Sequence, residues 1–167
     1  MILYPKLYLT NVKEITLELM EKYNLKGLIL DVDNTLIDLD KKILDGTKQW
    51  CDNLKHNGIK IFILSNTNKV DKVKAVADEL ELDFINFAKK PTKSGFKKAQ
   101  KIMEIKPEEI AVVGDQIFTD VFGGNRMKMF TILTKPLDSR DIFITRLKRP
   151  IERIVINSYV KNITKEK

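Results

Sequence analysis

Short runs of apolar residues alternate with amphipathic stretches along the middle of the chain. Each run is nearly continuous, which is typical of strands buried on both faces of a parallel sheet. Five strands are predicted, at residues 28–30, 59–64, 84–87, 110–113 and 129–133. The stretches between them place apolar residues at helical spacing. Strands and helices in alternation predict right-handed crossovers and an α/β fold.

Two further helical segments are predicted on either side of this sheet. Residues 11–23 have Asn11 as a helix cap and apolar side chains along one stripe. Residues 135–167 are predicted to form a basic helical segment, with Pro150 in the first turn of its helix. The apolar face expected on that helix consists of Ile151, Ile154, Val155 and Tyr159. Both segments are expected to pack onto the sheet.

Composition limits the chemistry that the chain can perform. It has 167 residues with one Cys and one His. This length suits one domain, so we expect a single domain over residues 1–167 with a core at about 27–133. One cysteine closes no internal disulfide, and this Cys and His count excludes Cys/His zinc clusters and Cys-His nucleophilic pairs. Any catalysis should therefore rely on carboxylates.

The charge of the chain favours an anionic partner. Lys and Arg total 30 against 23 Asp and Glu, a formal net charge of +7. Residues 135–167 hold nine basic and four acidic residues, a local excess of five. This excess is interpreted either as a solvated helix face or as a surface for peripheral contact with an anionic membrane. Without a secretory signal or an apolar stretch of about 18 residues, the expected location is the cytoplasm.

Polar side chains follow the predicted strands at the points where the strands end. They are Asp31, Asp33 and Thr35 after the first strand, Ser65 and Asn66 after the second, Lys89 and Lys90 after the third, and Asp115 and Asp120 after the fourth. The carboxyl ends of parallel strands lie on one edge of a sheet, where ligands bind. We therefore expect these side chains to lie close together.

Several carboxylates at one edge need a counter-charge. Two like charges about 4 Å apart repel by about 4 kcal/mol at an effective dielectric of about 20. An all-oxygen ligand set without histidine favours Mg²⁺. Hydroxyls and a lysine beside such a cation are typical of a phosphoryl-transfer site. The residues alone leave open whether Asp31 or a metal-bound water attacks the phosphorus.

The polar residues resemble, in order, the four motifs of the haloacid dehalogenase (HAD) superfamily. The motifs are Asp31-Val32-Asp33-Asn34-Thr35, Ser65-Asn66, a lysine before Pro91, and Gly114-Asp115-Gln116 followed by Asp120. With Gly123-Gly124-Asn125-Arg126 and the basic C-terminal segment, they look like subfamily IIIA phosphatases of the bacterial YqeG type, which are related to the mitochondrial phosphatidylglycerophosphate phosphatase. The resemblance implies a Rossmann-like three-layer sandwich around a five-stranded parallel sheet in the order 3-2-1-4-5.

The resemblance also implies catalytic and phosphate-binding roles. Asp31 would attack the phosphorus and form an aspartyl-phosphate, while Asp33 would act as general acid and then as general base. The implied phosphate-binding residues are Thr35, Ser65, Asn66 and Lys90. Lys89 competes with Lys90, which we choose because it directly precedes Pro91 as in the family.

The metal implied by the resemblance is Mg²⁺. Its expected ligands are the carboxylates of Asp31 and Asp115 and the backbone carbonyl of Asp33. Asp120 is expected to act through a water molecule or from just outside the ligand set.

The spacing of the motifs leaves no room for a cap domain over the site. About thirty residues between Thr35 and Ser65, and about two dozen between Asn66 and Lys90, are each used by one helix and one strand. An open site suits large or membrane-embedded esters, so the leading hypothesis is a Mg²⁺-dependent phosphomonoesterase acting on phosphatidylglycerophosphate. The alternatives are an uncapped phosphatase for sugar-phosphate, nucleic-acid-end or phosphoprotein substrates, and a non-catalytic RNA- or ribosome-associated module. Nucleic-acid binding is disfavoured because basic residues and aromatics are not interleaved.

Overall fold

One parallel sheet of six strands runs through the part of the chain that the computed structural model describes, residues 2–138 and 143–165. The strands are β1 Leu7–Leu9, β2 Gly27–Leu30, β3 Lys60–Leu64, β4 Asp83–Ile85, β5 Ile110–Gly114 and β6 Phe130–Thr134. Their order across the sheet is β1-β6-β5-β2-β3-β4, and every neighbouring pair is parallel. The α/β class predicted from the apolar runs is confirmed.

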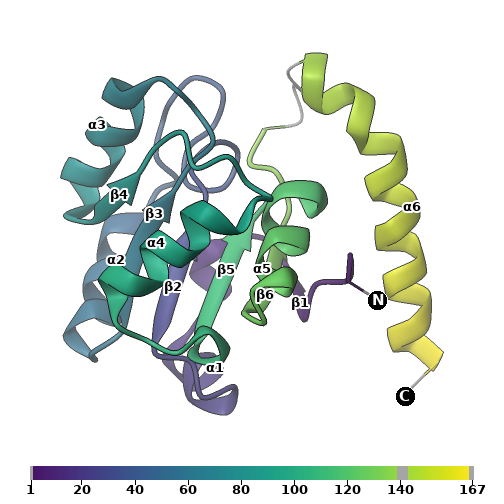
Figure 1. Ribbon diagram of the computed structural model, residues 1–167, viewed down its shortest axis with the longest axis horizontal. Coiled ribbons are helices and arrows are strands. Elements are labelled where there is room, and N and C mark those ends of the chain that lie inside the picture. Colours follow the sequence, from purple (N-terminus) through teal and green to yellow (C-terminus); the bar gives the residue numbers. More distant parts are fainter. Residues whose placement is uncertain (1, 139–142, 166–167) are drawn as a thin grey trace.

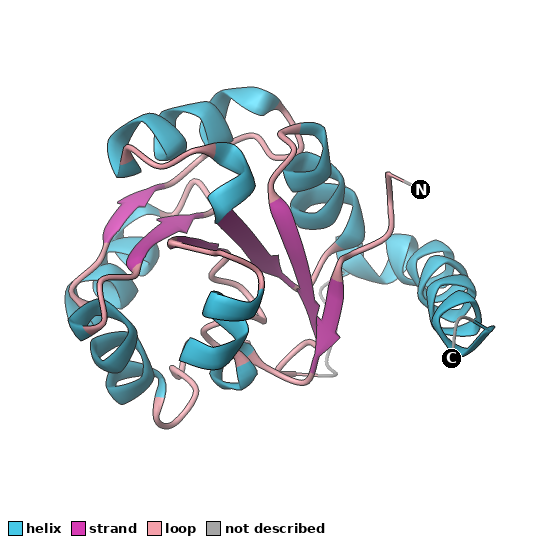
Figure 2. Ribbon diagram, turned by 90° about the horizontal axis from the view of Figure 1, so that it is seen from below, coloured by secondary structure: helices cyan, strands magenta, loops and turns pink. Residues whose placement is uncertain are grey.

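Helices cover both faces of this sheet (Figure 2). The α-helices are α1 Leu17–Lys22, α2 Thr47–His56, α3 Val70–Leu80, α4 Lys93–Met103, α5 Phe122–Arg126 and α6 Phe143–Lys165. Three short helical turns complete the helices of the described residues: the 3-10 turns Val12–Glu14 and Pro107–Glu109, and the π-helical turn Ile117–Val121. In β2, Leu28 packs with the core beneath α2 and α3, whereas Ile29 packs with Phe96 of α4. The strand is continuously apolar because both of its faces are buried.

The predicted number of five strands was wrong, because β1 adds a sixth. It lies beside β6, with Leu7 opposite Ile132. β1 has only three residues, all half-buried, and it precedes the alternating stretch of residues 27–133 from which the strands were predicted. The remaining strands, β4-β3-β2-β5-β6, keep the predicted order 3-2-1-4-5.

The helix predicted over residues 11–23 is interrupted near its middle. Asn11 caps only a 3-10 turn, and Thr16 then caps α1 as a separate helix. Between them, Ile15 has an extended backbone, is fully buried, and accepts a hydrogen bond of 2.8 Å from the indole N–H of Trp50. Tertiary contacts at Ile15 and the new cap at Thr16 therefore outweigh the helical periodicity.

The C-terminal helix α6 lies along the β1 edge of the sheet (Figure 1). Pro150 is inside this helix and not in its first turn, which corrects the prediction. Tyr159 is buried against the body of the protein, but Ile151 and Ile154 are 54% and 67% exposed, so the predicted common apolar face was wrong. The contacts of buried Glu152 and Tyr159 determine which side of α6 faces inward. Residues 139–142, part of the predicted basic segment, lie outside the described residues.

Candidate active site

The carboxyl ends of three adjacent strands bring predicted site residues together. Asp31 follows β2, Ser65 follows β3 and Asp115 follows β5, and β2 lies between the other two strands. The N–H of Asp31 donates to the carbonyl of Val113 over 2.9 Å, which extends the strand pairing one residue beyond β2. The sheet thus fixes the backbone of the site before any side-chain contact is made.

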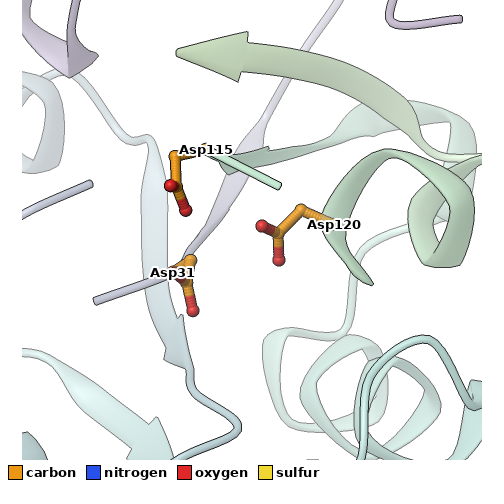
Figure 3. Close-up of side chains that lie close together, drawn as sticks. All are labelled: Asp31, Asp115 and Asp120. Carbon is orange, nitrogen blue, oxygen red and sulfur yellow. The ribbon is translucent and has the colours of Figure 1, made fainter. Parts of the chain in front are cut away.

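Three buried carboxylates meet at this edge. Asp31, Asp115 and Asp120 each offer an oxygen atom, and these oxygens all lie within 4.8 Å of one another. Figure 3 shows the three side chains close together. Carboxylate oxygens at this spacing fit a hard divalent cation such as Mg²⁺. The carboxylate of Asp33 is not a member of this group. The expected role of the Asp33 backbone carbonyl as a metal ligand stays a prediction.

A single buried ammonium group lies among these carboxylates. The Nζ atom of Lys90 donates to Oδ1 of Asp31 over 2.7 Å and to Oδ1 of Asp120 over 2.6 Å. The side chain of Lys90 is 2% exposed, so both contacts are shielded from solvent. Lys90 contacts two of the three carboxylates, and a cation bound between Asp31, Asp115 and Asp120 would offset further negative charge at this edge.

The pKa values of Asp31 and Lys90 are both raised above their ordinary values, but for different reasons. Burial raises the pKa of Asp31 to about 7, with Lys90 acting against that rise and Asp120 adding to it. Burial disfavours the charged form of Lys90, but Asp120 and Asp31 outweigh it and raise the pKa of Lys90 above its ordinary value. Lys90 therefore remains a cation at the centre of the site.

Asn66 fixes the backbone of Lys90. The side-chain amide of Asn66 donates to the carbonyl of Lys90 over 2.9 Å, and its oxygen accepts the N–H of Lys90 over 2.6 Å. The Lys90–Pro91 peptide bond is cis. Lys89 instead places its ammonium over the ring of exposed Phe87, 5.2 Å from the centroid. The structure thus places Lys90, and not Lys89, in the cluster, whereas a direct phosphate contact by Asn66 stays a prediction.

Two buried hydroxyl groups lie close to the same strand ends. Among the described residues, the Oγ1 atom of Thr35 has no hydrogen-bond partner, although it is buried. The Oγ atom of Ser65 accepts the N–H of Thr67 over 3.3 Å, so its own proton is available for donation. A buried hydroxyl without a partner is costly, and a phosphoryl oxygen would supply the missing acceptor.

Gly114 and α6 determine the position of Asp120. A Cβ atom at Gly114 would lie 2.2 Å from Oδ2 of Asp120, so only glycine permits this close approach. The π-helical turn that carries Asp120 begins at Ile117, whose N–H donates to Oε1 of Glu152 over 3.0 Å. Such turns are frequent at functional sites. From the sequence, Glu152 is only one residue of the basic segment predicted over residues 135–167, because its contact with Ile117 depends on the placement of α6.

Asp33 lies at the open side of the site, next to a residue that sequence reasoning missed. Its side chain is 40% exposed, and its Oδ1 atom lies 2.5 Å from the ammonium of Lys72 on α3. An exposed carboxylate near the nucleophile position suits proton exchange with a leaving group and with water. No sequence motif marks Lys72 as a site residue. Its proximity to Asp33 arises only from the packing of α3.

The fold and the site together define an enzyme of the phosphatase type. Carboxylates, hydroxyls and a buried lysine lie at the carboxyl edge of a doubly wound sheet, where such folds bind their ligands. The chain belongs to the haloacid dehalogenase-like hydrolase family, which matches residues 39–128. The residues that follow β2 precede the matched span.

Individual relatives agree with this assignment. The chain is 40% identical to the probable phosphatase YqeG of Bacillus subtilis (strain 168) over 155 residues, covering 92% of this chain and 90% of that protein. It is 25% identical to the chloroplastic/mitochondrial phosphatidylglycerophosphate phosphatase 1 of Arabidopsis thaliana, covering 94% of this chain and 48% of that protein. An uncharacterised protein from Listeria monocytogenes serotype 4b shares the fold, with a TM-score of 0.56, 22% identity, and coverage of 71% and 85%.

Proposed function

We propose that the protein is a Mg²⁺-dependent phosphomonoesterase that works through an aspartyl-phosphate intermediate. The observation that carries this proposal is the group of three buried carboxylates, two of which contact the ammonium of Lys90. The buried hydroxyl of Thr35, without a hydrogen-bond partner among the described residues, adds a donor for a phosphoryl oxygen. Membership in a hydrolase family also supports the proposal.

In the proposed reaction the two aspartates after β2 divide the chemistry. An oxygen of Asp31 attacks phosphorus in line, and an acyl-phosphate bond forms as the ester P–O bond breaks. Asp33 gives its proton to the departing alkoxide, which leaves as an alcohol. Asp33 then takes a proton from water, whose oxygen attacks the same phosphorus. Inorganic phosphate is released, and Asp31 returns as a free carboxylate.

The other residues bind the phosphoryl group. Thr35 and Ser65 would donate their hydroxyl protons to its oxygens, and Lys90 would offset part of its charge. Asp31, Asp115 and Asp120 would hold Mg²⁺, together with the backbone carbonyl of Asp33. The bound cation would neutralise charge on the phosphoryl oxygens and bring the phosphate close to the nucleophile.

For the substrate we propose phosphatidylglycerophosphate or another large phosphate ester. The support comes from the Arabidopsis relative, which carries that name, and from the open surroundings of Asp33. Between Thr35 and Lys90 the structure contains only α2, β3, α3 and β4 as regular elements, so nothing in this described stretch forms a cap domain. A bulky leaving group can therefore reach Asp33 from solvent.

We propose that the protein is located in the cytoplasm and contacts an anionic membrane peripherally. The supporting surface is on α6, where Ile151 and Ile154 are exposed next to exposed Arg153. Apolar side chains flanked by basic residues favour an anionic bilayer surface. Within residues 2–138 and 143–165, no helix is both long and apolar enough to cross a bilayer.

Two assays test the proposed function. Purified protein should release phosphate from p-nitrophenyl phosphate with Mg²⁺ but not with EDTA. It should also turn over phosphatidylglycerophosphate in mixed micelles with a higher kcat/KM than sugar phosphates. Tight, salt-sensitive RNA binding without turnover of any ester would contradict the proposal and favour the RNA-associated alternative.

A further inference from the structure

A lysine-lined depression lies next to the candidate active site, because one of its wall residues, Lys72, contacts Asp33. Its volume is about 580 Å³, and its charged wall residues are Lys41, Lys69, Asp71 and Lys72. We call this depression the lysine groove. A second depression of about 390 Å³ shares Lys41 and Lys72 with it. Three lysines against one aspartate give the lysine groove an excess of positive charge.

Lys72 links the lysine groove to the candidate active site. Its ammonium contacts Asp33, and its side chain is 16% exposed. An ammonium group has three N–H donors, and Asp33 is the one acceptor that the structure records for Lys72 among the described residues. Lys72 can therefore donate to Asp33 and to a second acceptor in the groove at the same time.

The other two lysines of the groove form no ion pair that the structure records among the described residues. Within the described residues, neither Lys41 nor Lys69 has a carboxylate oxygen within 4.0 Å. By contrast, Lys74 on the same helix as Lys72 pairs with Asp78. Lys72 and Asp71 of the groove belong to α3, and α3 and α6 lie on opposite sides of the molecule (Figure 1). The charge of the groove is therefore distinct from that of the basic C-terminal segment.

We infer that the lysine groove binds a second anionic group carried by the leaving alcohol of the substrate, an inference that rests on the proposed phosphatase function. Asp33 is the proposed proton donor to the leaving oxygen, so the atoms attached to that oxygen lie on the Asp33 side of the site. A phosphodiester or carboxylate a few bonds further on would reach the ammonium groups of Lys72, Lys41 and Lys69. The substrate class is thus a phosphate monoester whose alcohol bears its own negative charge.

The test compares two soluble substrates that differ in this one group. Glycerophosphoglycerophosphate and glycerol 3-phosphate share a phosphorylated glycerol, but only the first carries a phosphodiester on its leaving alcohol. The wild-type protein should prefer the first by about 10-fold or more in kcat/KM, mainly through KM, because charge-assisted hydrogen bonds form to the diester. The double variant Lys41→Met/Lys69→Met should bring the ratio of the two kcat/KM values close to one.

Control variants separate the groove from general charge effects. Lys74→Met removes a lysine from the same helix outside the groove and should keep the wild-type ratio. Lys41→Arg/Lys69→Arg keeps the charge and should retain most of the preference. A separately added phosphodiester, glycerophosphoglycerol, should not increase turnover of glycerol 3-phosphate. Such activation would overturn the inference by making the groove a site for a separate effector.

The remaining outcomes distinguish the inference from the proposed function. Equal kcat/KM values for the two substrates in the wild-type protein, with turnover of both, would overturn the lysine groove as a substrate site and leave the phosphatase function intact. A preference that survives in the double variant would do the same. No phosphate release from either substrate or from p-nitrophenyl phosphate would overturn the phosphatase function and the inference together.

Discussion

The ammonium of Lys90 lies 2.6 Å from a carboxylate oxygen of Asp120, and both side chains are almost completely buried. The same ammonium also contacts Asp31, so one cation serves two carboxylates, with Asp115 close by. A charge pair of this kind is costly to break, because the remaining partner stays buried without compensation. Lys90 therefore connects the stability of the site to its proposed chemistry.

Replacing Lys90 with Met should lower both activity and stability. Loss of the ammonium leaves Asp31 and Asp120 without their shared counter-charge, which we expect to reduce the free energy of unfolding by about 3–5 kcal/mol in EDTA. Millimolar Mg²⁺ should restore part of this loss by replacing the missing positive charge. Urea unfolding followed by circular dichroism, with and without Mg²⁺, measures both effects. The exposed neighbour Lys89, replaced in the same way, should change stability little; equal losses in the two variants would contradict this account.

Mg²⁺ alone should stabilise the folded protein if the carboxylates form its site. A ligand that binds only the folded state at about 100 times its Kd adds about 2.7 kcal/mol. Thermal unfolding should therefore move to higher temperature with added Mg²⁺, and Asp115→Asn should abolish that shift. Asp78→Asn, an exposed carboxylate on α3, is the matched control. A shift that persists in Asp115→Asn would place the cation elsewhere.

Gly114→Ala should displace Asp120 and reduce catalysis. The added Cβ would lie 2.2 Å from Oδ2 and 2.3 Å from Cγ of Asp120, so that side chain must move. Misplacement of a catalytic group by about 1 Å can cost about 100-fold in rate, and we expect a fall in kcat of that order. Gly27→Ala is the comparison, because Gly27 begins β2, at the end of that strand away from Asp31. Its added Cβ would meet the flexible end of Met103, so we expect this variant to affect stability more than kcat. An unchanged kcat in Gly114→Ala would show that Asp120 is not required in its present position.

Asn66→Ala should reduce activity through the placement of Lys90. The variant loses both hydrogen bonds to the backbone of Lys90, each with a net value of about 1 kcal/mol. We expect kcat to fall about 10-fold or more, while KM for p-nitrophenyl phosphate changes less. Asn68→Ala in the same loop, whose side chain makes no hydrogen bond recorded within the described residues, should keep wild-type kinetics. Steady-state kinetics of the two variants decides between positioning and a direct phosphate contact, which would raise KM instead.

The strand ends of the site could be predicted because two simple rules apply to them. The buried apolar runs indicated where β2, β3 and β5 end, and parallel strands place those ends on one edge. Asp31, Ser65 and Asp115 therefore lie together, as the pattern indicated. Lys90 follows a short strand and a loop, and its choice over Lys89 depended on Pro91 and on family resemblance.

Features that depend on tertiary packing could not be predicted from local pattern. β1 has three half-buried residues, and among the described strands it pairs only with β6. The contact of Lys72 with Asp33 depends on how α3 packs beside β2 and β3. Ile154 fits a helical stripe, yet it is exposed because Glu152 and Tyr159 determine the inward side of α6. Periodicity shows which residues share a face but not which face is buried.

Trapping the covalent intermediate tests the central claim most directly. Wild-type protein is mixed with substrate and Mg²⁺, quenched during turnover, and reduced with borohydride, which converts an aspartyl-phosphate to homoserine. Peptide mass spectrometry should find homoserine at position 31 only when substrate and Mg²⁺ are both present, and Asp31→Asn should be folded but inactive. An unmodified Asp31 during full turnover, together with near wild-type activity of Asp31→Asn, would contradict the account and favour direct attack by water.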